Sequence, residues 1–187
     1  MAENLLFFFS ALGVFNACLL AVYLIVFKAD HQLADYFLGG LLLCLVVRVG
    51  VSCFHFFGTV PKSAIKLGLI VHLLSGPLIL FFMKFQARSD KKALRRSLVH
   101  LAFWTLVLLL VWFSFDFATW NWRIRYVIHF VLTVYLVYTG VTWRKELLLF
   151  IQSGDLPFKT QKAVLVYLSL VLIGVGFAIS LVTNYIL

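Results

Sequence analysis

Charged side chains are scarce in this 187-residue chain, and carboxylates are the scarcest of them. Asp, Glu, Lys and Arg together make up 12% of the residues, with 7 acidic against 16 basic side chains, whereas the residues AVILMFWYC make up 64%. Soluble globular domains contain about 25% charged residues and about 45–50% apolar ones. The shortage of charge therefore excludes a soluble domain and indicates a protein that crosses a membrane several times.

Cysteine and catalytic motifs are sparse as well. The three cysteines, Cys18, Cys44 and Cys53, lie within apolar runs and form no CxxC pair, so we expect buried thiols rather than a disulfide framework. The chain contains no nucleophile elbow, phosphate-binding loop, paired carboxylates or HExxH motif. The sequence therefore favours a non-enzymatic function.

Apolar runs long enough to cross the ~30 Å hydrocarbon core of a bilayer as helices are the dominant feature. Six such runs cover residues 4–27, 36–57, 67–85, 97–115, 126–143 and 163–186. The runs are continuous rather than alternating, which predicts helices and not barrel strands. We expect an all-α, polytopic bundle of six transmembrane helices that forms a single domain over residues 1–187. A further apolar run at 147–151 is too short to span and predicts a brief interfacial helix.

Basic residues are distributed unevenly between the two sides of this expected bundle. One side holds Lys28, Lys84, Arg88, Lys91, Lys92, Arg95, Arg96, Arg144, Lys145, Lys159 and Lys162, and the other holds Lys62, Lys66, Arg123 and Arg125. The positive-inside rule places the first side in the cytoplasm and both termini outside. We expect a bacterial cytoplasmic (inner) membrane, with the segment QARSDKKALRR contacting anionic lipid headgroups rather than nucleic acid. The lipid-contacting residues would be Arg88, Lys91, Lys92, Arg95 and Arg96.

A single charge, Arg48, lies deep within the second run. It is nine residues from the outer end of that run, about 14 Å at helical rise, and burying it in hydrocarbon costs ~2.5–3.5 kcal/mol or more. Ser52 follows it at a helical spacing, and Asn16 and Ser75 could line the same interior on neighbouring helices. The sequence predicts either a ligand-binding pocket made of these four residues or a structural arginine satisfied by backbone carbonyls, including those freed by Pro77.

Three histidines lie at similar depths on three of the predicted helices. His55, His72 and His129 span only ~5 Å along the membrane normal, so they could bind a metal ion or ligate haem. The alternative is that each histidine is hydrogen-bonded to its own bundle. His100 is too far along the membrane normal to join them.

The order of these features resembles a known family. The opening LLFFFSALGVFNACLLAVYLIVFK, the segment YFLGGLLLCLVVRVG with Arg48, the segment GLIVHLLSGPLILFFMKF with Gly76 and Pro77, and the histidine of LVHLAF resemble the membrane-embedded N-terminal domain of AraC-type (arabinose-regulator-like) transcription regulators. In that family the membrane domain is thought to sense envelope or extracellular cues, and a helix-turn-helix domain follows it. No such domain lies within these residues, so the resemblance implies sensing without direct binding to DNA.

We therefore expect a non-enzymatic membrane sensor or regulatory module that binds a ligand or partner through an outward-facing polar pocket around Arg48. The first alternative is an accessory subunit of a larger membrane complex, bound to a membrane-protein partner or to further copies of itself. The second is a haem- or metal-binding redox protein. A membrane partner that co-purifies in mild detergent would favour the first alternative, and a Soret band or a bound metal would favour the second.

Overall fold

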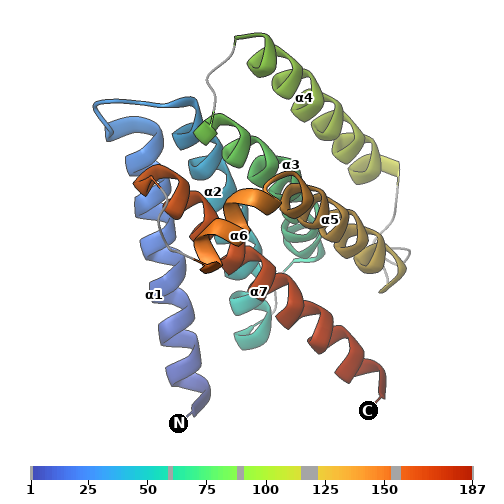
Figure 1. Cartoon of the computed structure of the whole chain (residues 1–187). Coiled ribbons are helices and arrows are strands. Elements are labelled where there is room, and N and C mark those ends of the chain that lie inside the picture. Colours follow the sequence, from blue (N-terminus) through green and yellow to red (C-terminus); the bar gives the residue numbers. More distant parts are fainter. Residues whose placement is uncertain (1, 59–60, 88–90, 115–121, 153–156, 187) are drawn as a thin grey trace.

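The computed structural model describes the chain except for residues 1, 59–60, 88–90, 115–121, 153–156 and 187. The side chains of residues 2–6, 55–57, 87, 91, 114, 122–125, 158–159 and 176–186 also lie outside the described part. The described elements are all helical (Figure 1). They are α1 (Ala2–Val22), the π-helix η1 (Tyr23–Phe27), α2 (Leu33–Phe57), α3 (Lys62–Ala87), α4 (Lys91–Ser114), α5 (Trp122–Thr142), α6 (Arg144–Gln152) and α7 (Phe158–Ile186).

The predicted all-α architecture is confirmed, while the number of membrane crossings is confirmed only in part. Within the described residues, α1 with η1, α2, α3 and α4 are each long and apolar enough to cross a membrane. The pair α5 and α6 meets the same condition jointly, although the two helices are bent by 69°. In α7 the described apolar stretch, Thr160–Val175, is shorter. The helices are thus those of a multi-pass membrane protein with four or five apolar spans.

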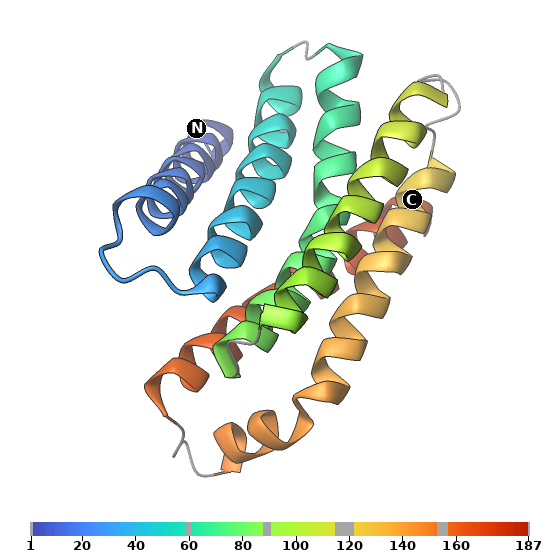
Figure 2. The same cartoon turned by 90° about the horizontal axis from the view of Figure 1, so that it is seen from above.

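Helix α3 lies at the centre of the bundle. It packs against α2, α4, α5 and α7, and 67% of its apolar segment is buried, compared with 11% for the segments of α1 and α4. Figure 2 shows α1, α2 and α3 side by side, with α4 and α5 beyond α3. Apolar side chains on both faces of α3, such as Ile79 and Phe81, form the core with residues of α2, α5 and α7. Side chains on α3 therefore meet every other part of the core.

Glycines permit the two closest approaches around α5. The ring of Tyr135 on α5 packs on Gly76 of α3, where an added Cβ would come within 2.8 Å of the ring. Tyr167 of α7 lies over Gly140 of α5 in the same way, and an added Cβ there would overlap its hydroxyl oxygen. Small residues let membrane helices approach closely where the surrounding lipid gives no hydrophobic driving force. These two contacts fix how α3, α5 and α7 face one another.

The short run predicted to form an interfacial helix is helical. Helix α6 covers Arg144–Gln152 and turns sharply away from α5 after the buried Trp143. None of its residues is buried, and Leu148, Leu149 and Ile151 are exposed. Such an exposed apolar side on a short basic helix is typical of segments that lie along a membrane surface.

Candidate functional site

Arg48 lies in the second half of α2 and bonds first to its own helix. Its Nη1 donates to Ser52 Oγ at 2.6 Å, and the Ser52 hydroxyl in turn donates to the Arg48 carbonyl at 3.1 Å. The four-residue spacing stacks the two side chains on one face, as the sequence predicts. Ser52 therefore orients the guanidinium, which is only partly buried.

Two histidines from neighbouring helices meet near Arg48. The rings of His72 on α3 and His129 on α5 meet edge to face, with centroids 5.7 Å apart, and both His129 and Arg48 act electrostatically on His72. His72 is almost fully buried, with 2% of its surface exposed. The name basic cluster is used here for Arg48 of α2, His72 of α3 and His129 of α5, of which the two histidine rings are in contact. Two of these three residues belong to the predicted histidine set and one to the predicted ligand pocket.

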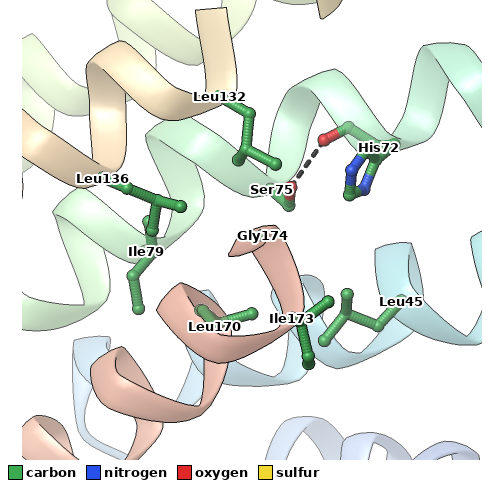
Figure 3. A pocket seen from close by; sticks show the side chains of 9 residues that line it. All are labelled: Leu45, His72, Ser75, Ile79, Leu132, Leu136, Leu170, Ile173 and Gly174. Atoms are coloured by element: carbon green, nitrogen blue, oxygen red, sulfur yellow. Dashed lines mark hydrogen bonds between the residues drawn. The ribbon is translucent and has the colours of Figure 1, made fainter. Parts of the chain in front are cut away.

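A small cavity lies beside His72, one of the three residues of the basic cluster (Figure 3). His72 and Ser75 supply its polar lining, and the rest is apolar: Leu45, Ile79, Leu132, Leu136, Leu170, Ile173 and Gly174. The Ser75 hydroxyl donates to the His72 carbonyl at 2.5 Å, so its proton is used within α3. The cavity has about 10 Å³ of space for the centre of a water molecule, and a single water needs ~10–15 Å³ of such space. A ligand larger than water would require α2, α3, α5 and α7 to move apart.

No carboxylate of the chain lies on the apolar segments that carry the basic cluster. The stretch from residue 36 to residue 89 contains neither Asp nor Glu, and neither does residue range 126–142. Asp35, at the start of α2, is engaged elsewhere: it bonds to Lys28 at 2.5 Å and caps the helix through the Gln32 backbone N–H at 2.8 Å. Within these apolar segments the basic cluster is therefore balanced by neutral histidines and backbone dipoles, or by an anion from outside the segments.

The structure places the other predicted site residues differently. Asn16 is exposed on α1, which packs on α2, so its side chain is not enclosed with the basic cluster. The side chain of His55 lies outside the described residues. Within the described residues, no group of three His, Cys, Asp or Glu side chains could hold a metal ion. The predicted site of three histidines therefore stays a prediction, with His72 and His129 as the two members that the structure brings together.

A second polar group, which the sequence reasoning missed, joins α4 to α5. His100 Nε2 lies 2.5 Å from Tyr135 Oη, and Trp104 Nε1 donates to Tyr135 Oη at 2.7 Å and to His100 Nε2 at 3.1 Å. The spacing of His100 and Trp104 by four residues was the available signal, because it places both on one face of a helix. His100 was considered only as a partner for the other histidines, whereas its partner is the tyrosine that packs on Gly76.

Comparison of the chain with protein-family models, with curated proteins and with solved structures gives no match. The resemblance to AraC-type membrane regulators therefore stays a prediction from the sequence.

Proposed function

We propose that the protein is a non-enzymatic membrane sensor or regulatory module in which the basic cluster binds an anionic ligand. The observation that carries this proposal is the contact of the His72 and His129 rings, with Arg48 close enough to act electrostatically on His72, on three helices whose apolar segments contain no carboxylate. A charge placed inside a membrane bundle marks a functional site by default, since it costs several kcal/mol to keep there. A bound anion would offset that cost.

Ligand binding would change the packing of the helices. The cavity beside His72 and Ser75 has room for about one water, so a larger anion separates the helices that line it. Because α5 carries His129 and continues into α6, its movement would reach the basic residues Arg144 and Lys145 on the surface of α6. A partner that contacts α6 would then respond to ligand binding at the basic cluster.

We further propose six crossings in a bacterial inner membrane, with both termini outside. Helix α7 has 29 residues, so it spans ~43 Å at helical rise, which exceeds the ~30 Å of a hydrocarbon core. The start of α1 and the end of α7 lie at the same end of the molecule (Figure 1), as an even number of crossings requires. In this orientation Lys92, Arg95 and Arg96, which are exposed, face the cytoplasmic leaflet and its anionic lipids. Arg88 and the side chain of Lys91 lie outside the described residues.

The test is anion-dependent stabilisation of the purified protein in lipid nanodiscs. Sodium acetate, succinate and phosphate are added at constant ionic strength, and unfolding is followed by tryptophan fluorescence. Binding of an anion at 100 times its Kd stabilises the folded state by ~2.7 kcal/mol. We expect this stabilisation in the wild type and its loss in Arg48→Gln, with Lys84→Gln as the control because Lys84 is an exposed cation on α3.

Two results would contradict the proposal. The first is equal stabilisation of wild type and Arg48→Gln by every anion, which would make the effect a general one of charge. The second is a stoichiometric membrane protein that co-purifies with the wild type and without which the chain does not fold, because that result assigns the chain to a larger complex as an accessory subunit.

A further inference from the structure

Helix α4 is held only loosely in the bundle. Within the described residues its backbone comes close to α3 and to no other helix, and 11% of its apolar segment is buried. Its polar link to α5 is made by long side chains, His100 and Trp104 on α4 and Tyr135 on α5, here called the α4–α5 triangle. A change in these three side chains therefore changes how α4 is attached to α5.

The hydrogen bonds of the α4–α5 triangle require a neutral His100. An indole N–H only donates, and Trp104 Nε1 donates to Tyr135 Oη at 2.7 Å and to His100 Nε2 at 3.1 Å. His100 Nε2 is therefore an acceptor, which leaves the ring proton on Nδ1. The same Nε2 lies 2.5 Å from Tyr135 Oη, so the tyrosine hydroxyl donates to it. In this state the indole N–H and the tyrosine O–H each have an acceptor.

Protonation of His100 conflicts with this arrangement. A proton added at Nε2 turns that atom into a donor, so two N–H donors face each other across the 3.1 Å between His100 and Trp104. Both then compete for Tyr135 Oη, and the tyrosine O–H loses its acceptor. Polar groups left without partners inside a membrane bundle are costly. At least one of the three side chains must therefore turn away, and the link between α4 and α5 weakens.

No carboxylate lies on the surrounding helices to compensate a charge on His100. The sequences of α3, α4 and α5 contain neither Asp nor Glu. The His100 ring meets Tyr135 of α5 and, edge to face, Phe81 of α3. The charged side chains one helical turn from these contacts are Arg96 on α4 and Lys84 on α3, and both are exposed cations. A cationic His100 is therefore more stable in the headgroup region than in the α4–α5 triangle.

We propose that the α4–α5 triangle is a proton-sensitive latch, in which neutral His100 holds α4 against α5 and protonation of Nε2 releases it. Histidine is the side chain whose charge changes between pH 5 and 8. His100 lies three residues, about 4.5 Å, inside the apolar run that begins at residue 97, so a proton reaches it from the nearer membrane surface. The latch does not depend on the basic cluster or on its ligand.

The distance between α4 and α5 tests the proposal directly. In a cysteine-free background, Leu98→Cys on α4 and Val141→Cys on α5 replace exposed residues and carry nitroxide labels. Pulsed EPR measures the separation of the labels in lipid nanodiscs at pH 8 and pH 5. We expect one short distance at pH 8 and a second, longer distance at pH 5. Each interhelical hydrogen bond that is lost should lower the ratio of closed to open protein about three-fold.

Three variants separate the latch from other effects of pH. His100→Gln keeps an acceptor oxygen for Trp104 and Tyr135 that does not titrate, so the labels should stay close at pH 5. Trp104→Phe removes the N–H that opposes the added proton, and it should also lose the response to pH. His31→Gln is the control and should respond as the wild type does, because His31 is exposed between η1 and α2.

Three results would overturn the proposal. The first is a label separation that is the same at pH 8 and pH 5 with the α4–α5 triangle intact, and this result holds even where a variant fails to fold. The second is a response to pH that persists in both His100→Gln and Trp104→Phe. The third is an equal loss of the response in His31→Gln, which would assign it to a general effect of charge.

Discussion

The contact of Tyr167 with Gly140 gives the most direct test of how α5 and α7 pack. Tyr167 Oη donates to the Leu136 carbonyl at 2.8 Å. In an α-helix that carbonyl points toward the backbone N–H of residue 140. The hydroxyl lies over residue 140, where an added Cβ would overlap it, and the sequence supplies Gly140 at that position.

The effect of a Gly140→Ala substitution on the free energy of unfolding follows from this geometry. Overpacking a tight interface costs ~1–3 kcal/mol, and displacing the hydroxyl loses an interhelical hydrogen bond worth ~0.6 kcal/mol on average in a membrane. Replacing glycine by alanine inside a helix returns ~0.5–1 kcal/mol. We therefore expect Gly140→Ala to destabilise the fold by about 1–3 kcal/mol.

A double-mutant cycle isolates the contact. In a Tyr167→Phe background the overlapping oxygen is absent, and the nearest remaining ring carbon, Cζ, would lie 3.2 Å from the added Cβ. A shift of a few tenths of an ångström accommodates that distance, so Gly140→Ala should be close to neutral there. The expected coupling free energy is at least ~1 kcal/mol, within the range measured for residues in contact.

Reversible unfolding by SDS in mixed micelles, followed by circular dichroism, provides the free energies. Gly13→Ala is the matched control, because nothing lies within 4 Å of the Cβ that it adds. A Gly140→Ala variant as stable as wild type, or one equally destabilised in both backgrounds, would refute the proposed approach of α7 to α5.

Two other predictions concern the α4–α5 contact and the topology. Tyr135→Phe removes the hydroxyl to which both His100 and Trp104 are hydrogen-bonded, and it should lower the free energy of unfolding by ~1–2 kcal/mol in the same assay. Tyr138→Phe is the control and should have no effect, because Tyr138 is exposed on the same helix. In a cysteine-free background, a cysteine at Lys62 should react with a membrane-impermeant maleimide in intact cells, and one at Lys92 only after permeabilisation; the reverse pattern would contradict the proposed orientation.

Much of the fold could be predicted because the length and hydropathy of each apolar run are properties of the sequence alone. The apolar runs mark helices, since a backbone in hydrocarbon satisfies its polar groups only as a helix or a closed barrel. The pairing of Arg48 with Ser52 was predictable for the same reason, because the two residues share one helix and its period fixes their relative direction. The closeness of His72 and His129 followed from their matched depths.

The rotation of each helix about its own axis was less predictable. Asn16 was expected to face Arg48, but the apolar residues of α1 are spread almost evenly around the helix, so they form no stripe that shows which face meets α2. The same limit applies to Gly76 and Gly140, on which Tyr135 and Tyr167 pack. Small residues in the sequence indicate that some helix approaches closely, while the identity of that helix depends on packing across the whole bundle.

The proposed function of the basic cluster has its physical origin in the shortage of carboxylates. Among the described side chains, the acidic ones are Asp30, which is exposed, Asp35, which is bonded to Lys28, and Glu146 on α6. None of them belongs to the apolar segments that hold the basic cluster. A protein can keep a cation in such segments when neighbouring histidines stay neutral, when carbonyls accept its hydrogen bonds, or when an anion comes from outside. Only the last of these gives Arg48 a response to the surroundings. Arg48→Gln should therefore abolish the response to anions, and a variant that kept this response would contradict the assignment of the ligand site to Arg48.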